Sequence, residues 1–216
     1  PFGAWLGLPG GGYVLSLSPE RFLAVTGDAI ETRPIKGTRP RSADPDEDRQ
    51  LAAELAGSAK DRAENVMIVD LLRNDLGRVC RAGSVQVPQL FGIESFASVH
   101  QMVSVVTGRL QPGVGALDAL HACFPGGSIT GAPKRRAMEV IRELEPERRG
   151  LYCGAIGYIG FDGTMDTNIT IRTAVCDAHT MTYRAGGGVV VDSDEAAEYQ
   201  ETRDKALAFL RLAGED

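Results

Sequence analysis

The order of the expected strands and helices is the feature that most constrains how this chain can fold. Residues 13–18 alternate like a strand, residues 21–26 read as a second strand, and residues 30–35 return after a turn at Gly27-Asp28. Two helices follow this hairpin, and later hairpins and helices succeed one another without a regular strand–helix–strand repeat. Such an order favours an α+β fold over a doubly wound parallel sheet.

The remaining elements are expected from apolar patterning and from turn residues. We expect helices over residues 44–55, 58–73, 115–124 and 192–212, and a further helix that has Pro133 near its first turn and continues to about residue 144. We expect strands over residues 84–111, 154–161, 167–176 and 180–184, with turns at Pro88, Gly92 and Asp162-Gly163. The helix over residues 58–73 contains the runs VMIV and LL, which are too apolar for a surface helix. If this helix is buried, its Glu64 and Asp70 each need a partner or a metal.

Length, charge and cysteine spacing narrow the class of protein. With 216 residues, of which 43% are hydrophobic, the chain is large enough for one domain with a substantial core. Its net charge of −6 argues against broad nucleic-acid binding, which needs a basic surface. No apolar run could span a bilayer, and no signal peptide is visible. The four cysteines are widely spaced, so we expect buried thiols in a reducing compartment, the cytoplasm.

Residues 33–38, with the sequence RPIKGT, hold a candidate catalytic lysine. Pro34 cannot donate to a sheet ladder and marks a strand end or edge, and Gly37 allows a backbone geometry that a side chain would forbid. Lys36 lies between them beside Ile35, and a lysine in a partly apolar pocket can act as a base or nucleophile. Only four of the 23 basic residues are lysines, which supports a specific role. On these six residues alone, an exposed lysine in a turn is the alternative.

Two glycine-rich segments are candidate ligand sites. Residues 125–134, PGGSITGAPK, lead into a helix, and free backbone N–H groups at such a loop suit an anion. Lys134, Arg135 and Arg136 oppose the helix dipole there, which indicates an acidic partner nearby. The alternative is an ordinary loop–helix junction with a solvated basic face. Residues 186–188 are three glycines inside strand-like sequence, which suggests backbone pressed against a ligand.

The last helix carries charged residues at helical spacing. We expect it to start near Asp192, with Glu195 placed for a capping box. Glu198, Glu201 and Lys205 fall on one of its faces. They either face a site or form an exposed ion-paired stripe, since Glu201 and Lys205 are well spaced for an ion pair.

Six motifs together resemble one family. They are SPER at residues 18–21, PIKGT at 34–38, AEN at 63–65, GGSITGAPK at 126–134, ITIRT at 169–173 and GGG at 186–188. Their order and spacing, along essentially the whole chain, are similar to those of the chorismate-binding enzymes, which include anthranilate, aminodeoxychorismate, isochorismate and salicylate synthases. Anthranilate synthases usually carry alanine at the position of Lys36, whereas aminodeoxychorismate synthases carry lysine. The chain therefore looks most like component I of the latter.

The resemblance implies a fold and a reaction. The fold would be α+β, with two packed β-sheets, helices on the outer faces, and the site in the cleft between the sheets. Family members are considerably longer, so residues 1–216 would be a chorismate-binding catalytic domain that matches their C-terminal portion, with the upstream part absent. The reaction would be Mg²⁺-dependent amination of chorismate at C4 to 4-amino-4-deoxychorismate, in para-aminobenzoate and folate biosynthesis. A glutamine amidotransferase partner would supply the ammonia.

The resemblance also implies roles for individual residues. Glu64 and Glu201 would hold Mg²⁺, which prefers oxygen ligands and typically joins one or two carboxylates to an anionic substrate. Glu20 would be the general acid that protonates the leaving 4-hydroxyl, and Lys36 the nucleophile that attacks C2 of the ring. Substrate contacts would come from the cations Arg172 and Lys205 and from Gly37, Thr38, Ser128, Tyr152, Gly186, Gly187 and Gly188.

Two alternatives remain open at this point. One is another chorismate-utilising reaction, to anthranilate, isochorismate or salicylate, and the other is a truncated fragment that binds chorismate without catalysis. Anthranilate synthases carry a histidine, implicated in pyruvate loss, where this chain aligns Gln101, with His100 as its neighbour. This departure weakens the anthranilate alternative.

Overall fold

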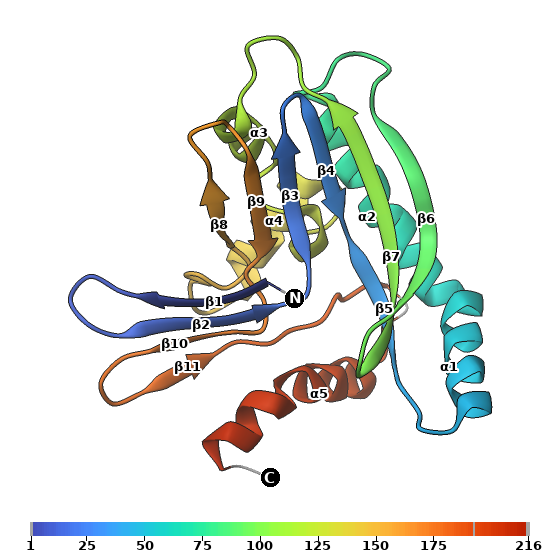
Figure 1. The fold of residues 1–216 in the computed structure, drawn as a ribbon. Coiled ribbons are helices and arrows are strands. Elements are labelled where there is room, and N and C mark those ends of the chain that lie inside the picture. The colour runs from blue at the N-terminus through green and yellow to red at the C-terminus, as the bar shows by residue number, and fades with distance from the viewer. Residues whose placement is uncertain (1, 192, 215–216) are drawn as a thin grey trace. The chain divides into compact units, whose positions relative to one another are not determined.

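The computed structural model describes residues 2–191 and 193–214, which fold into two compact units (Figure 1). Unit 1 contains Pro1–Glu20, Arg149–Ile156 and Asn168–Asp216, and unit 2 contains Arg21–Arg148 and Gly157–Thr167. Each unit thus joins segments that are far apart in the sequence. That residues 1–216 act as one catalytic domain stays a prediction.

A four-stranded antiparallel sheet forms the centre of unit 1 (Figure 1). Its strands lie in the order β1 (Phe2–Gly7), β2 (Tyr13–Ser18), β10 (Thr173–Cys176) and β11 (Met181–Tyr183). In β2 the side chains of Val14, Ser16 and Ser18 are buried and those between them are exposed, which is the alternation predicted from the sequence. Because β10 pairs with β2, the sheet brings the end of the ITIRT motif beside the N-terminal strands.

Helix α5 (Glu195–Ala213) packs against this sheet. The ring of Phe209 stacks on that of Tyr183 in β11, with 4.1 Å between the ring centroids. Asp194 caps the helix by accepting a hydrogen bond from the backbone N–H three residues on, at 2.9 Å. The expected start at Asp192 lies outside the described residues, and the expected capping box is wrong, because Glu195 is the first residue of the helix.

A seven-stranded sheet is the main sheet of unit 2. It runs in the order β5 (Ile35–Pro40), β7 (Val99–Arg109), β4 (Ala29–Arg33), β3 (Arg21–Thr26), β9 (Met165–Ile169) and β8 (Ala155–Ile159), and β6 (Gln86–Ser95) also pairs with β7. Strand β7 is 11 residues long and pairs antiparallel with β4, β5 and β6. It therefore fixes the position of β5, the strand that carries Lys36.

Helices α1 (Pro45–Gly57) and α2 (Ala59–Gly77) pack against β5, β6 and β7 (Figure 1). The core of unit 2 includes side chains at most 3% exposed from the helices and the strands, namely Leu55, Ile68, Leu72, Leu76, Ile30, Met102 and Val106. The predicted burial of α2 is therefore confirmed for one face of the helix, whereas Val66 of the apolar run is 40% exposed. Helices α3 (Ala116–Cys123) and α4 (Lys134–Leu144) lie close to where helices are expected. A 3₁₀ turn (Gly127–Ile129) lies between them, in the segment expected to be a loop.

Several expected elements differ from the structure. Residues 30–35 belong to two strands, because Pro34 has no N–H and separates β4 from β5. Pro88 and Gly92 make no turns; they lie inside β6, whose register with β7 shifts on either side of Gln89. Residues 167–176 are divided between β9 and β10 of different sheets, and residues 186–191 lie outside the strands.

The expectation that Asp70 needs a buried partner or a metal is also wrong. Its side chain is 64% exposed and accepts a hydrogen bond from Arg73 at 2.8 Å on the outer face of α2. The helix is buried on one side only, and Asp70 lies on its exposed side.

Two antiparallel sheets with helices confirm the α+β class. Among the described residues, no helix is long and apolar enough to cross a membrane.

Candidate active site

Lys36 projects from an irregular part of β5. The pairing of β5 with β7 shifts register between Ile35 and Thr38, so residues 36 and 37 form a bulge. Gly37 has a φ of 79°, in the region that L side chains rarely adopt. A Cβ atom there would also lie 2.8 Å from Cδ1 of Leu55 in α1. The special backbone geometry expected at Gly37 is therefore confirmed, and it sets the position of the preceding lysine.

The Lys36 side chain is half-buried, which does not fit an exposed lysine in a turn. The described residues of unit 2 give its ammonium no hydrogen bond and no ion pair. A charged group that is partly withdrawn from water without a partner carries a free-energy cost. Within the described part of its unit, therefore, no ion pair or hydrogen bond of the ammonium explains the position of Lys36.

His100 and Gln101 in β7 lie beside this bulge. Gln101 pairs with Thr38 of β5, so both side chains lie on one face of the sheet. His100 is 2% exposed, with Nδ1 2.7 Å from Oγ of Ser95 and Nε2 3.0 Å from Oδ1 of Asp48. Both ring nitrogens of His100 are occupied in joining β7 to β6 and α1. His100 is therefore a structural residue, and Gln101 is the one placed beside the Lys36 bulge.

Glu64 lies on α2 with 21% of its side chain exposed, 4.0 Å from the Nζ atom of Lys60. The next residue, Asn65, is fully buried; its Oδ1 accepts a hydrogen bond from Ser104 at 2.6 Å, while its Nδ2 has no partner among the described atoms. An unpaired buried amide is an exception in native proteins and calls for an explanation. From the sequence, Asn65 stands out only as part of the AEN motif. A polar residue directly before an apolar helical run was the signal that could have singled it out.

The glycine-rich loop packs on α2 as well. Ser128 is half-buried in the 3₁₀ turn, and a Cβ atom on its neighbour Gly127 would lie 3.0 Å from Cδ2 of Leu71. At the end of the loop, Nζ of Lys134 lies 2.6 Å from Oδ2 of Asp75. Asp75 is therefore the acidic partner predicted from the helix dipole. The alternative, in which Lys134 lies on a solvated basic face, is wrong.

In unit 1, Arg172 lies in the bend between β9 and β10 and not within a strand, as the expected strand over residues 167–176 would have it. Its φ of 50° is uncommon for a residue with a Cβ atom, and such strain clusters at functional sites. The carbonyl of Arg172 accepts a hydrogen bond from the N–H of Leu17 at 3.0 Å, which holds the bend. Burial raises the pKa of the Tyr183 phenol, and the Arg172 charge opposes that shift.

Lys205, Glu201, Gly186 and Tyr152 meet in unit 1. Nζ of Lys205 lies 2.5 Å from Oε1 of Glu201 and donates a hydrogen bond to the carbonyl of Gly186 at 3.2 Å. A Cβ atom on Gly186 would lie 3.0 Å from the Tyr152 hydroxyl, so glycine permits this close approach. Burial raises the pKa of Tyr152. Four expected site residues are thus brought together, and the ion pair expected between Glu201 and Lys205 is present.

The other expected residues of unit 1 are Gly187, Gly188 and Glu20. Gly187 and Gly188 are exposed, and a Cβ atom on Gly187 would lie 2.9 Å from Oε2 of Glu198. Glu20 is 6% exposed and directly precedes β3. Its carbonyl accepts a hydrogen bond from the N–H of Ile169 at 3.0 Å, and its N–H donates to Oγ of Ser18 at 3.3 Å. Its backbone is therefore fixed on both sides.

The expected site residues fall into two sets. Unit 2 holds Lys36, Gly37, Thr38, Glu64 and Ser128, and unit 1 holds Glu20, Tyr152, Arg172, Gly186, Gly187, Gly188, Glu201 and Lys205. Within unit 2 the bulge adjoins helices α1 and α2, and the glycine-rich loop adjoins α2. Within unit 1, Lys205 meets Glu201 and Gly186, and Gly186 approaches Tyr152. The catalytic and binding roles of these residues stay predictions.

The donor chemistry is compatible with Mg²⁺. Across residues 2–191 and 193–214, no three His, Cys, Asp or Glu side chains gather closely enough to form a metal cage. Mg²⁺ does not require one, since it keeps several waters and is held by one or two carboxylates together with substrate oxygens. Glu64 and Glu201 are partly exposed carboxylates, at 21% and 46%, and each lies near a lysine that limits its net charge. Each of them is therefore a donor of the kind that Mg²⁺ accepts.

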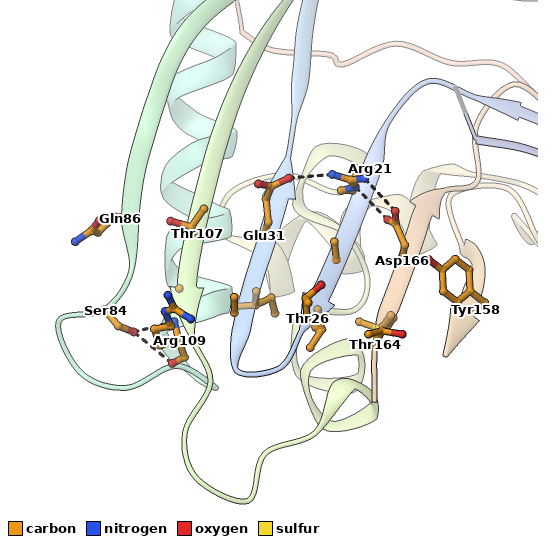
Figure 2. A pocket seen from close by; sticks show the side chains of 16 residues that line it. Arg21, Thr26, Glu31, Ser84, Gln86, Thr107, Arg109, Tyr158, Thr164 and Asp166 are labelled. Atoms are coloured by element: carbon orange, nitrogen blue, oxygen red, sulfur yellow. Dashed lines mark hydrogen bonds and ion pairs between the residues drawn. The ribbon is translucent and has the colours of Figure 1, made fainter. Parts of the chain in front are cut away.

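A separate cavity of about 780 Å³ lies on unit 2 (Figure 2). Four charged side chains line it, Arg21, Glu31, Arg109 and Asp166, and none of the expected site residues does. Arg21 forms ion pairs with Glu31 at 2.9 Å and with Asp166 at 3.0 Å, and Arg109 pairs with Asp28 at 2.7 Å. These charges compensate one another, so the cavity offers no uncommitted cation for a dicarboxylate.

Comparison with known proteins agrees with the fold and the motifs. The model of the family described as chorismate binding enzyme matches residues 1–211. Aminodeoxychorismate synthase component 1 of Salmonella typhimurium is 60% identical over 210 residues, which are 97% of this chain and 46% of that protein. Anthranilate synthase component 1 of Streptomyces coelicolor is 51% identical over 211 residues, 97% of this chain and 41% of that protein. The crystal structure of anthranilate synthase component I from Streptococcus pneumoniae matches with a TM-score of 0.84 at 42% identity, covering 95% of this chain and 45% of that one.

The α+β architecture and these matches define a class: the chain belongs to the family of chorismate-binding enzymes. Within that family it is similar to component 1 of aminodeoxychorismate synthase, which confirms the resemblance seen in the motifs. The chain spans about half the length of the curated relatives that it matches.

Proposed function

We propose that this chain is the chorismate-binding part of an aminodeoxychorismate synthase component I. The reaction is the amination of chorismate at C4 in para-aminobenzoate and folate biosynthesis, with ammonia from a separate glutamine amidotransferase, in the reducing cytoplasm. The observation that carries the proposal is Lys36, a half-buried ammonium without a partner in its own unit, presented by a bulge that requires Gly37. Identity of 60% to a relative of that name supports it.

In the proposed reaction, the amine of Lys36 forms a bond to C2 of chorismate. The two ring double bonds shift, and the C4 hydroxyl leaves as water with a proton from Glu20. Ammonia then forms a bond to C4, the double bonds shift back, and the bond between C2 and Lys36 breaks. The net change exchanges the hydroxyl group at C4 for an amino group and regenerates the lysine.

Binding and orientation fall to the remaining residues. The planar guanidinium of Arg172 can pair with a carboxylate through two hydrogen bonds. Arg172 lies in a bend, outside the regular strands. Lys205 meets a second carboxylate beside Tyr152 and the glycine segment. Thr38, Ser128 and the backbone of residues 186–188 complete the contacts. Mg²⁺ held by Glu64 and Glu201 neutralises the charge of a substrate carboxylate when it is bound.

Product analysis tests this function directly. The full chain is incubated with chorismate, MgCl₂ and ammonium at pH 8, and the products are separated and identified by mass. We expect 4-amino-4-deoxychorismate, formed only when ammonium is present. Anthranilate, isochorismate or salicylate as the main product would replace this function with another of the family. Chorismate binding without turnover would support a non-catalytic fragment.

Anthranilate formation is the second candidate, because two of the matched proteins are anthranilate synthases at 51% and 42% identity. Two features of the site disfavour it. Lys36 occupies a position where those enzymes usually carry alanine. The histidine associated with pyruvate loss corresponds to Gln101, and the adjacent His100 is committed to Ser95 and Asp48. Anthranilate is fluorescent, so its appearance can be followed in the same reaction.

A further inference from the structure

The ion pair between Lys134 and Asp75 is buried and complete. Asp75 is 3% exposed, and only 16% of the Lys134 side chain is accessible. The Lys134 ammonium donates three hydrogen bonds, to Oδ2 of Asp75 at 2.6 Å, to the carbonyl of Cys123 at 3.0 Å and to the carbonyl of Pro125 at 2.8 Å. An ammonium has three donors, so all of them are used.

Stability alone is a poor explanation for such a pair. The free-energy cost of removing two charges from water offsets much of the attraction between them. Replacing such a pair by apolar residues of similar size often leaves the stability of a protein unchanged or higher. Burial raises the pKa of Asp75 even though the Lys134 and Arg78 cations oppose the shift, so the surroundings disfavour the charged carboxylate. The pair is therefore better understood through what it holds in place.

Lys134 joins the two ends of the glycine-rich loop to α2. Its own Cα begins α4, directly after the loop, while its two carbonyl partners lie on either side of Phe124, where the loop begins. Between these ends, Oγ1 of Thr130 donates to the carbonyl of Gly126 at 2.9 Å. The loop is thus closed at its base by one ammonium, and Ser128 lies at its centre.

The surface that receives this loop is the face of α2 that carries Glu64. Positions 64, 68, 71 and 75 follow one another at intervals of four, three and four residues, which places them on one stripe of a helix. Gly127 packs on Leu71, and Asp75 lies about 16 Å beyond Glu64 along the helix axis. The loop therefore lies along the same stripe as the expected metal ligand.

We propose that Lys134 is a positioning residue that fixes the glycine-rich loop to α2 and so sets where Ser128 meets the substrate relative to Glu64. The substrate part of this inference rests on the proposed function, because it assumes that Ser128 and Glu64 act on chorismate. Lys134 itself, with all three donors used inside the protein, does not touch the substrate.

The variant that tests this removes both charges at once. Lys134→Met alone leaves the Asp75 carboxylate buried without a partner and can prevent folding. In Asp75→Asn/Lys134→Met no buried charge remains, but the carbonyls of Cys123 and Pro125 lose their donor. Arg135→Met on the same helix is the matched control, since the Arg135 side chain is 94% exposed.

Three measurements on the full chain read out the loop and the site. We expect faster hydrogen exchange over residues 124–131 in the double variant and faster thiol labelling of the otherwise buried Cys123. We expect kcat/KM for chorismate to fall by about 10- to 100-fold, mainly through KM, because a misplaced contact far from the reacting atoms costs about that much. The control variant should match the wild type in all three.

The possible failures are distinguishable. Unchanged exchange in residues 124–131 overturns the inference whatever the enzyme assay gives. Faster exchange with an unchanged KM shows that Lys134 is merely structural, which also overturns the positioning role. If the wild-type protein neither binds nor turns over chorismate, the proposed function fails, and the substrate part of the inference fails with it. Faster exchange together with a raised KM and a smaller change in kcat supports the inference.

Discussion

The backbone of Gly37 lies so close to Asp61 that a Cβ atom on residue 37 would be 2.7 Å from Cγ of Asp61. Real Cβ contacts essentially never reach this distance, so the bulge of β5 and the first turns of α2 fit together only with glycine at this position. The orientation of Lys36 therefore depends on a helix that is distant from it in sequence.

The first prediction follows from this contact. Gly37→Ala adds a Cβ at a φ of 79° and against Asp61, and we expect a loss of about 1–3 kcal/mol in the free energy of unfolding together with a large loss of activity. Thermal denaturation and chorismate turnover measure both. Gly57→Ala, at the end of α1 with no atom within 4 Å of the new Cβ, is the matched control and should keep wild-type stability and activity. Equal behaviour of the two variants would contradict the packing argument.

The second prediction concerns acid stability. A hydrogen bond from Arg41 lowers the pKa of Asp48 well below its usual range, with further help from the N–H of Ser42 and from His100. A carboxyl whose pKa is lower in the folded state stabilises the fold above its unfolded pKa, about 3.9, and loses that contribution as the pH falls below it. We expect the wild-type melting temperature to drop more steeply between pH 5 and pH 3 than that of Asp48→Asn.

Arg41→Gln should also make the fall in melting temperature between pH 5 and pH 3 less steep, because the hydrogen bond from Arg41 is the largest cause of the lowered pKa of Asp48. At pH 7 both variants should be less stable than the wild type. If the slopes of all three proteins coincide between pH 5 and pH 3, Asp48 does not contribute to acid stability in this way.

The third prediction concerns the cysteines, all four of which lie in the described part of the chain and form no disulfide there. Cys80, Cys123 and Cys153 are buried, and burial raises the pKa of Cys123 to about 12, with the Asp75 charge adding to the shift. Cys176 is partly exposed at the end of β10. A disulfide reagent at pH 8 should therefore modify one thiol quickly, and peptide mapping should place it at Cys176. Cys176→Ser should abolish the fast phase; a fast phase that persists would mean that a buried thiol becomes accessible in the native state.

Local patterning predicted most elements, and long-range pairing explains where it failed. The helix that follows the glycine-rich loop is confirmed, because Pro133 near its start and Pro146 beyond its end are local signals. The bend at Arg172 was missed, since the run ITIRTAV keeps the character of a strand while the chain passes from β9 to β10. Pro88 and Gly92 are typical turn residues, and the sequence does not show that the long strand β7 tolerates shifts in register with β6.

The candidate site shows the same division between local and long-range information. A residue's own neighbours indicated that Gly37 is conformationally special, that Lys134 needs an acidic partner and that Glu201 pairs with Lys205. That the partner of Lys134 is Asp75, 59 residues away, follows only from the packing of the loop on α2. The buried, half-satisfied amide of Asn65 likewise depends on Ser104 of a distant strand.

The fourth prediction tests the metal. Glu64→Gln and Glu201→Gln keep the size of each side chain and remove the charge proposed to bind Mg²⁺. Losing a residue that only supports a metal ligand costs about 10–100-fold in affinity or activity, so losing a ligand should cost at least that much, with the fold intact. Turnover against MgCl₂ concentration and circular dichroism measure the two effects. Glu139→Gln, an exposed carboxylate on α4, is the control. A wild-type Mg²⁺ dependence in both site variants would remove the metal assignment.

The last prediction separates two roles of Lys36. If the lysine only neutralises a substrate carboxylate, arginine should partly replace it, because the positive charge is retained. If it forms a bond to carbon, it must lose a proton during the cycle, which an arginine in a protein does not do. The covalent role therefore predicts that Lys36→Arg loses activity about as fully as Lys36→Met. Robust amination by Lys36→Arg would make the lysine a charge and not a nucleophile.

Trapping the intermediate gives this prediction a second, direct readout. With chorismate and Mg²⁺ but no ammonium, the proposed reaction stops after the C4 hydroxyl has left, so chorismate minus one water stays attached to the lysine. Intact-protein mass spectrometry should show this mass gain, and peptide mapping should place it on Lys36. Adding ammonium should discharge the adduct as product, and Lys36→Met should never acquire it. Because Lys36 is also the observation that carries the proposed function, an adduct that persists in Lys36→Met would remove both the nucleophile and the main reason for proposing C4 amination.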